Sequence, residues 1–240
     1  MAKTVLITGA SGGIGRACAR TAARAGWNVA IHWYENESAA HTLATELRAL
    51  GCNAEPFCAD VRDSGQVNAC AAAATARFSH IDGLLCCAGA AQQKLLQKVT
   101  DEEWRDVLDI NLTGTFYFIR ALLPQMIARK QGAIVTMSSV WGVRGGSCEA
   151  AYSAAKAGVI GLTRALAQET GPSGITVNCL APGVIDTRMC AGFSEETRRA
   201  LAEETPLSRL GTPEDVARAA IFLLEQPFVT GQVLGVDGGF

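Results

Sequence analysis

Charged residues are scarce in this chain, and long apolar runs are absent. Asp, Glu, Lys and Arg make up 18% of the 240 residues, and 21 basic against 23 acidic side chains give a formal net charge of −2. A protein built to bind a nucleic-acid backbone normally shows a basic stripe, and none is present. No apolar run reaches the length that spans a bilayer, and the one near the N-terminus is too short for a signal peptide. We therefore expect a cytoplasmic protein with neither a nucleic-acid nor a membrane partner.

Metal-ligand spacing is also missing, although the chain contains nine cysteines and three histidines. The number of cysteines is odd, no C-x-x-C pair occurs, and only Cys86 and Cys87 are close neighbours. These spacings match no zinc site, so we predict no metal. The cysteines are interpreted as reduced, mostly buried, small apolar residues of a cytosolic protein.

The chain does contain a regular alternation of short apolar runs with longer segments of helical periodicity. The pattern predicts strands at 3–8, 27–33, 51–59, 81–87, 132–137, 175–180 and 233–236, and helices at 14–25, 66–78, within 101–130, at 150–169 and at 213–225. This alternation predicts a parallel sheet covered by helices on both faces. No linker or repeat interrupts it, so residues 1–240 are expected to form a single domain. The polar stretch 188–206 is either a flap over a site or an ordinary exposed helix.

The turn after the first predicted strand is rich in glycine. Residues 8–15 read Thr-Gly-Ala-Ser-Gly-Gly-Ile-Gly. Glycines let backbone N–H groups approach a pyrophosphate, and the following helix N-terminus favours negative charge. A tight structural turn would also explain a glycine cluster alone. Its place at the start of a strand–helix–strand pattern favours a dinucleotide site.

A second motif combines a tyrosine, a lysine and a serine. Tyr152 and Lys156 are four residues apart on a predicted helix, so they share one face, and Ser139 lies just beyond a predicted strand. A phenol has a pKa near 10, which is too high for acid–base work at neutral pH. A neighbouring ammonium favours the phenolate, and a positioned hydroxyl can hydrogen-bond a substrate oxygen. The three residues therefore indicate acid–base catalysis, with an exposed helix pair as the plainer alternative.

Together the two motifs resemble the short-chain dehydrogenase/reductase (SDR) family, and the resemblance covers nearly the whole chain. It implies an α/β single-domain Rossmann fold, with a doubly wound parallel sheet of about seven strands and helices on both faces. It implies that Ser139 orients and polarises a carbonyl and that Tyr152 is the general acid in reduction. Lys156 would lower the Tyr152 pKa and hold the nicotinamide ribose, and Asn111 would support a water-linked proton relay.

The same resemblance assigns the cofactor contacts. They are Gly9, Ser11, Gly13, Ile14, Gly15, Trp33, Asp60, Val61, Ala88, Gly89, Tyr152, Lys156, Pro182, Gly183, Ile185 and Thr187. NAD-using members place an acid at the end of the second strand. Residues 32–34 here are His-Trp-Tyr, so NADP(H) is favoured. NAD stays open because Gly12 replaces the arginine that many NADP-using relatives have in the glycine loop, and Arg16 is the nearest cation in sequence.

One departure from the family pattern falls after the fourth predicted strand. Relatives usually have Asn-Asn where this chain has Cys86 and Cys87. The second Asn normally ties neighbouring backbone segments together, and Cys87 can form only weak hydrogen bonds. We expect compensation by water or packing; a functional thiol or a vicinal disulfide is the alternative.

The resemblance implies reduction of a ketone to a secondary alcohol, and two substrates remain open. The overall pattern looks most like 3-oxoacyl-[acyl-carrier-protein] reductases, whereas residues 90–95 and 141–149 resemble elongation factor P 5-aminopentanone reductases. Both segments should line the substrate mouth, with Gln92, Trp141 and Glu149 as candidate contacts. Glu149 or the Trp141 face could attract an ammonium group, although Glu149 is also explained as a plain surface acid.

Other interpretations concern the partners and the activity. A carrier-borne substrate needs basic docking residues, for which Arg129 and Lys130 are candidates. Relatives are usually homotetramers. A catalytically silent dinucleotide-sensing regulator and an NAD-dependent alcohol dehydrogenase of the same family are the alternative functions.

Overall fold

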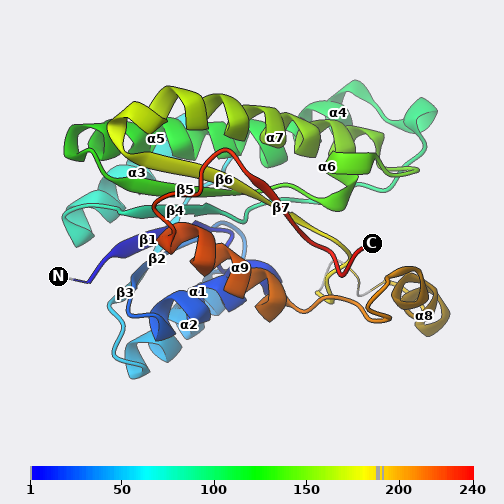
Figure 1. Ribbon diagram of the computed structural model, residues 1–240, viewed down its shortest axis with the longest axis horizontal. Helices are drawn as coiled ribbons and strands as arrows, with labels where there is room; N and C mark the ends of the chain where they lie inside the picture. The colour runs from blue at the N-terminus through cyan, green and yellow to red at the C-terminus, as the bar shows by residue number, and fades with distance from the viewer. Residues whose placement is uncertain (1, 188–189, 191) are drawn as a thin grey trace.

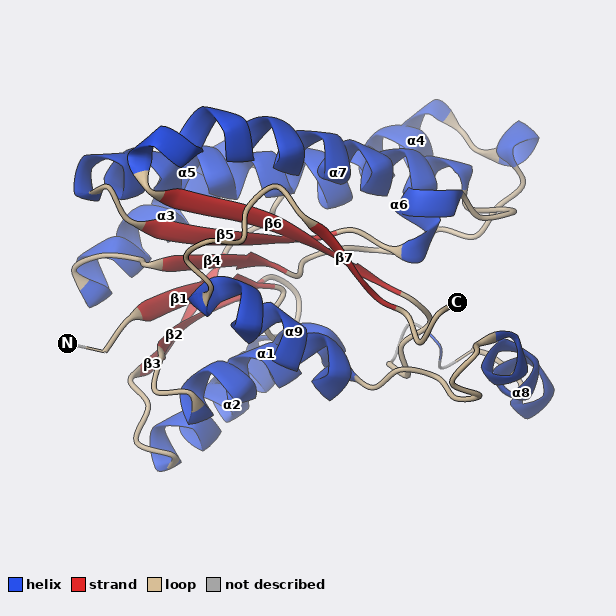
Figure 2. Ribbon diagram, in the orientation of Figure 1, coloured by secondary structure: helices blue, strands red, loops and turns tan. Residues whose placement is uncertain are grey.

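A seven-stranded parallel sheet runs through the part of the chain described by the computed structural model, residues 2–187, 190 and 192–240 (Figures 1 and 2). Its strands are β1 (Thr4–Thr8), β2 (Asn28–Trp33), β3 (Ala54–Cys58), β4 (Gly83–Cys86), β5 (Gly132–Met137), β6 (Ile175–Pro182) and β7 (Val233–Val236). The spatial order is β3-β2-β1-β4-β5-β6-β7, and every pair is parallel. The predicted parallel sheet of about seven strands is confirmed.

Helices cover both faces of the sheet (Figure 2). One layer contains α1 (Gly13–Arg24), α2 (Glu37–Ala49) and α9 (Pro213–Glu225), and the other contains α3 (Ser64–Phe78), α4 (Asp101–Leu108), α5 (Gly114–Arg129) and α7 (Ala150–Thr170). Successive side chains of a strand point to opposite faces. Val5 and Ile7 accordingly join the core beneath α1, α2 and α9, whereas Leu6 joins the core beneath α3 and α5. The sheet is therefore doubly wound, as the sequence predicts.

Three helical features differ from the sequence prediction. α2 is not among the predicted segments; its first turn is capped by Asn36, whose side chain accepts a hydrogen bond from the Ala39 N–H at 3.0 Å. The short helix α6 (Val140–Arg144) was also not predicted. The predicted helical stretch 101–130 is divided into α4 and α5 by a π-helical turn, Asp109–Thr113. Such turns occur frequently at functional sites.

The polar stretch 188–206 is described only in part, because residues 188, 189 and 191 lie outside the described residues. Within it, α8 (Glu195–Glu204) begins at Ser194, whose side chain accepts from the Thr197 N–H at 3.1 Å. In Figure 1 this helix stands apart from the two layers. No helix in the described ranges combines the length and apolar character that a bilayer crossing needs.

Candidate functional site

The loops that follow β1 and β4 meet at the carboxyl edge of the sheet. β1 is paired with β2 on one side and β4 on the other, so the winding direction reverses between these two strands. Ligands of open α/β sheets bind at such a switch point. The Ala88 N–H donates to Thr8 Oγ1 at 3.0 Å, and a Cβ on Gly9 would lie 2.9 Å from the Ala88 Cα. Because the loops touch here, only glycine fits at position 9.

The glycine-rich turn forms a cradle at the start of α1. The Gly12 N–H donates to the Gly9 carbonyl at 2.9 Å, which turns the chain into the helix. A Cβ on Gly15 would collide with the backbone of Gly9, and one on Gly13 would lie 2.9 Å from Thr187 Cγ2. In the described structure no side chain caps the N-terminus of α1. A glycine-rich helix N-terminus without a side-chain cap fits a dinucleotide pyrophosphate.

Arg16 lies on the first turn of α1 beside this cradle. Its Nη2 donates to the Ser11 carbonyl at 3.4 Å, a long hydrogen bond. Its Nε is buried without a hydrogen-bond partner in the described part of the chain. A buried donor with no acceptor is rare in a complete structure, so an anionic ligand group would fit here.

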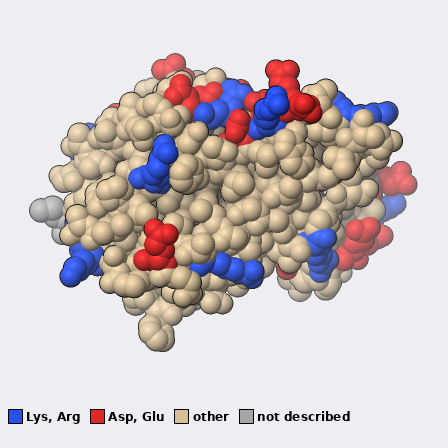
Figure 3. Space-filling model, turned by 90° about the horizontal axis from the view of Figure 1, so that it is seen from above, with Lys and Arg blue, Asp and Glu red and all other residues tan. Residues whose placement is uncertain are grey.

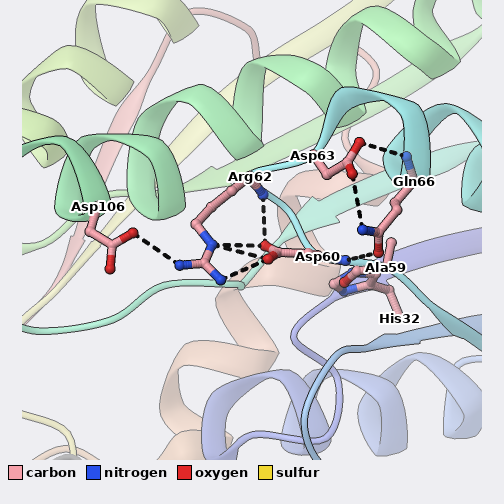
Figure 4. A network of polar contacts seen from close by, with 7 residues as sticks. All are labelled: His32, Ala59, Asp60, Arg62, Asp63, Gln66 and Asp106. Atoms are coloured by element: carbon pink, nitrogen blue, oxygen red, sulfur yellow. Dashed lines mark hydrogen bonds and ion pairs between the residues drawn. The ribbon is translucent and has the colours of Figure 1, made fainter. Parts of the chain in front are cut away.

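His32 supports the cradle from β2. Its Nδ1 accepts from the Gly9 N–H at 3.0 Å, and its Nε2 lies 3.0 Å from the Ala59 carbonyl (Figure 4). A carbonyl only accepts, so Nε2 carries the proton and the ring is neutral. Burial lowers the pKa of His32 to about 4, which keeps this tautomer at neutral pH.

Asp60, after β3, belongs to a charged network (Figure 4). Arg62 donates to both Asp60 carboxylate oxygens at 2.7–3.1 Å and to Asp106 of α4 at 2.9 Å. Hydrogen bonds from Arg62, and a weaker one from Tyr34, hold the pKa of Asp60 below its usual value. The network fixes this carboxylate at the edge of the expected adenine site. Val61 is buried there, and a Cβ on Gly114 would lie 2.8 Å from its Cβ.

The remaining predicted cofactor contacts also lie at the carboxyl edge. Trp33 ends β2 and packs against the core of the α1 layer. Pro182 ends β6, and the Gly183 N–H donates to the Val236 carbonyl at 3.1 Å. Ile185 is buried and pairs with Gly211 in an isolated bridge. The segment after β6 is thereby held beside the glycine cradle.

Ser139 and Tyr152 lie together above the end of β5. Ser139 is the N-cap of α6, and its Oγ accepts from the Trp141 N–H at 3.2 Å. Tyr152, on the first turn of α7, is 9% exposed. Burial raises the pKa of Tyr152 to about 12; a hydrogen bond with Ser139 lowers it slightly, and the Glu149 charge raises it. At neutral pH the phenol is therefore protonated in the unliganded site.

Lys156 lies one turn further along α7 and is 3% exposed. Its Nζ donates to the Met137 carbonyl at 3.0 Å and lies 5.5 Å from the centre of the Tyr152 ring. Burial lowers the pKa of Lys156 to about 8. Ser138 Oγ donates to the Lys156 carbonyl at 2.8 Å, which ties this part of α7 to the end of β5.

Asn111 lies within the π-helical turn and is fully buried. Its Nδ2 donates to the carbonyls of Ala90 and Val107, both at 2.9 Å, and its Oδ1 accepts from the Ala90 N–H at 3.3 Å. A Cβ on Gly89 would lie 2.8 Å from Asn111 Oδ1 and 3.3 Å from Lys156 Nζ. The fold therefore brings the Asn111 amide and the Lys156 ammonium close to one point beside Gly89.

The predicted substrate contacts surround this group. The Lys94 N–H donates to the Cys148 carbonyl at 2.6 Å, so the loop that contains Gln92 meets the loop that leads to Glu149. Trp141 packs against the apolar cluster that contains Tyr152. Glu149 is half-buried, its pKa is raised by that burial, and it forms no ion pair within the described residues.

The candidate docking residues lie away from the site. Arg129 ends α5 and donates to Asp82, the residue before β4, at 2.5 Å. Helix α5 runs antiparallel to the strands, so Arg129 and its neighbour Lys130 lie at the amino edge of the sheet, opposite the site. Their role in docking a carrier stays a prediction.

Two supporting residues could not be assigned roles from the sequence. His32 contacts Gly9 from 23 positions away, and Arg62 reaches Asp106 across 44 positions. Neither contact leaves a short-range pattern. The only sequence signal was His32 itself, a polar residue within the otherwise apolar run that predicts the second strand.

Comparison with known proteins agrees with this geometry. A family model described as "Enoyl-(Acyl carrier protein) reductase" matches residues 9–240. The 3-oxoacyl-[acyl-carrier-protein] reductase FabG of Staphylococcus aureus is 39% identical over 241 residues, covering 100% of this chain and 98% of its own. The crystal structure of a 3-oxoacyl-[acyl-carrier protein] reductase from Brucella melitensis has a TM-score of 0.93 and 38% identity, covering 99% and 91% of the two chains. A variant of actinorhodin polyketide ketoreductase, crystallised with NADPH, has a TM-score of 0.95 and 34% identity, covering 99% and 97%.

Proposed function

The chain belongs to the short-chain dehydrogenase/reductase family, and on that premise we propose that it is an NADP(H)-dependent reductase of a carrier-borne 3-oxoacyl group. The observation that carries the proposal is the meeting of Ser139, Tyr152, Lys156 and Asn111 beside the glycine cradle. The relatives named above supply the substrate class. The product would be a secondary alcohol.

The proposed mechanism starts from the protonation state of Tyr152. The dinucleotide would be held by the cradle and the segment 182–187, and it would supply the hydride. Ser139 Oγ would donate to the carbonyl oxygen, which raises the electrophilicity of the carbon. Tyr152 would give that oxygen its proton, since the buried phenol is protonated at neutral pH. The Lys156 ammonium would stabilise the phenolate that remains.

Reduction needs Tyr152 as an acid, and the buried phenol is protonated at neutral pH. Oxidation of an alcohol needs Tyr152 as a base, and burial disfavours the phenolate. An NAD-dependent alcohol dehydrogenase would need that phenolate at working pH. It would reduce NAD⁺ with a secondary alcohol faster than it oxidises NADPH with a ketone.

The preference for NADP(H) is supported by Arg16 and by the absence of an acid at the end of β2. The partly unpaired Arg16 guanidinium lies beside the cradle and would pair with a ribose phosphate. Replacing Arg16 with Ala should raise the KM for NADPH about tenfold and leave the KM for NADH within about twofold. Equal effects on both cofactors would contradict this assignment.

A second substrate class, an aminoketone, is favoured by Glu149. This acid is half-buried next to Tyr152 and has no cationic partner in the described ranges, so an ammonium group on the substrate would satisfy it. Glu149→Gln should then impair only aminoketone reduction. Gln92 and Trp141 remain proposed contacts for either substrate.

The molecular context is proposed as well. We expect residues 1–240 to act as one domain in the cytoplasm. A homotetramer is supported by α7, where Ala154, Ala157 and Gly161 are exposed. The middle of the face seen from above carries few charged side chains (Figure 3). Small, uncharged residues there would permit close packing against a second copy.

One assay separates these functions. NADPH oxidation is followed with an acetoacetyl thioester, free and carrier-bound, and with an aminoketone-modified elongation factor P. Reduction of the carrier-bound thioester supports the main proposal, and reduction of the modified protein alone supports the second. Tyr152→Phe should abolish turnover while leaving NADPH binding intact. A chain that binds NADPH but turns over none of these ketones would instead be a dinucleotide-sensing regulator.

A further inference from the structure

Phe240 is half-buried between two side chains of α6. Its ring centre lies 5.7 Å from that of Trp141, edge to face at 80°, and the Arg144 guanidinium lies 5.7 Å from its centre. Gly146 also lies against the Trp141 ring, so closely that a Cβ added at Gly146 would lie 3.0 Å from Trp141 Cδ2. The indole is therefore held by Phe240 and Gly146 as well as by the cluster that contains Tyr152.

Helix α6 connects this contact to the catalytic serine. Ser139 precedes the helix, and its Oγ accepts from the Trp141 N–H at 3.2 Å. At Gly142 a Cβ would lie 2.8 Å from the Lys156 carbonyl carbon, so the backbone of α6 packs directly on α7. Five residues form α6, which is too short to be stable without packing. Phe240 supplies further packing through Trp141 and Arg144.

The turn that contains Phe240 is itself fixed by segments that border the site. The Leu207 N–H donates to the Gly238 carbonyl at 3.2 Å, and a Cβ on Gly239 would lie 3.1 Å from Pro206 Cγ. The Gly183 N–H donates to the Val236 carbonyl at 3.1 Å. In Figure 1 the C-terminal end lies between α6 and the chain that leads from α8. The segments after β6 and α8 thus hold the turn that contains Phe240, and the Phe240 ring packs against Trp141 and Arg144 of α6.

We propose that Phe240 is a positioning residue for carbonyl reduction, which fixes α6 and thereby the Ser139 hydroxyl and the Trp141 ring. This inference rests on the proposed reductase function. Phe240 acts through Trp141 rather than on the substrate. Small displacements of catalytic groups lower reaction rates strongly, so loss of this contact should reduce turnover without weakening cofactor binding.

The test compares Phe240→Ala, Phe240→Tyr and the control Phe228→Ala; Phe228 is 100% exposed. Phe240→Ala should lower kcat/KM for the ketone about fivefold to tenfold, the size expected for loss of one aromatic pair and one cation–π contact. The Kd for NADPH should stay within about twofold. Phe240→Tyr should restore the activity, because it keeps the ring, and Phe228→Ala should match the unmodified protein.

A readout independent of activity follows the Trp141 ring. The near-ultraviolet circular dichroism of Trp141 is isolated by subtracting the spectrum of Trp141→Phe. Phe240→Ala should reduce this signal, and Phe240→Tyr should keep it. An unchanged signal together with unchanged kcat/KM would overturn the proposal, as would an equal loss of activity in Phe228→Ala. If the unmodified chain oxidises no NADPH with any ketone, the reductase function fails, while the Trp141 signal still decides whether Phe240 fixes α6.

Discussion

His32 makes the glycine cradle sensitive to acid. The neutral ring accepts the Gly9 N–H at Nδ1 and donates to the Ala59 carbonyl from Nε2, so both nitrogens are used. A second proton would have to bind at Nδ1, where it would face the Gly9 N–H. The ring is 2% exposed and lies 4.9 Å from the Phe118 ring, edge to face, so water cannot solvate the extra charge. Protonation should therefore break the contact that supports the loop.

The size of the effect follows from the two pKa values. The folded value is about 4, and the ordinary value is 6.5. Between these values the unfolded chain binds the proton and the folded chain does not, so stability falls as the pH falls. The gap of about 2.5 pH units corresponds to about 3 kcal/mol of unfolding free energy, of which about 2 kcal/mol is lost between pH 6.5 and 5. Above pH 6.5 this residue contributes no pH dependence.

The assay is urea unfolding, followed by circular dichroism, at pH values from about 7 down to 5. His32→Gln keeps an acceptor and a donor but does not titrate, so its loss of stability over this range should be smaller by about 2 kcal/mol. The exposed His41 gives the matched control, and His41→Gln should follow the unmodified protein. NADPH affinity of the unmodified protein should decline over the same range, because the Gly9 loop loosens. If the unfolding free energies of His32→Gln and of the unmodified chain fall equally between pH 7 and 5, the assignment of a buried neutral ring to His32 would be refuted.

Three further predictions concern the site. The pKa of Lys156 is lowered to about 8, so its ammonium is lost as the pH rises through that value; kcat/KM for ketone reduction should fall above pH 8, and Lys156→Met should lose activity about 100-fold at neutral pH. Gly15→Ala places a Cβ against the Gly9 backbone and should cost about 1–3 kcal/mol in urea unfolding, whereas Gly171→Ala, which meets nothing within 4 Å, should be neutral or stabilising. Arg62→Ala frees the Asp60 carboxylate and should raise the KM for NADPH severalfold at unchanged kcat; an unchanged KM would show that the network of Figure 4 does not order the adenine site.

Periodicity and turn chemistry in the sequence were enough to predict the architecture. Each buried strand is a short apolar run because helices cover both of its faces, and this pattern is local. α2 was not predicted, although its buried residues Ala40, Leu43, Ala44 and Leu47 follow the i, i+3, i+4, i+7 spacing of an amphipathic helix; two of the four are alanine, which contrasts less with the polar face than leucine does. The π-helical turn escaped because its residues fit a continuous helix equally well, and the extra residue is stabilised by Asn111 bonding to Ala90.

The candidate site was predictable where a motif fixes residues on one element, and less so where the fold brings elements together. Tyr152 and Lys156 share a face of α7 at a spacing that any helix imposes. The proximity of Ser139 to Tyr152 depends on α6 and α7 packing together, which the resemblance implied and spacing alone does not. The position of Arg129 could not be inferred from spacing, because it depends on the direction in which α5 crosses the sheet.

Cys86 and Cys87 stand where the family resemblance places two asparagines. Substitutions at these two positions distinguish the contribution of packing from that of hydrogen bonding. Both are free thiols. Beside them the Ala88 N–H donates to Thr8 Oγ1, which links the loops after β1 and β4, and Cys87 packs beside Cys18 in the core beneath α1.

The two cysteines should therefore respond differently to the same change. Cys86 is 2% exposed among apolar side chains, and burial raises its pKa, so Cys86→Ser buries a hydroxyl with no partner and should cost about 1–3 kcal/mol in urea unfolding. Cys87 is only half-buried, so water can reach a hydroxyl there and Cys87→Ser should cost about 1 kcal/mol or less. Equal losses at the larger value would mean that Cys87 is as closed to water as Cys86. Equal losses at the smaller value would mean that a polar group near the end of β4 satisfies the hydroxyl at position 86, and the packing argument would fail.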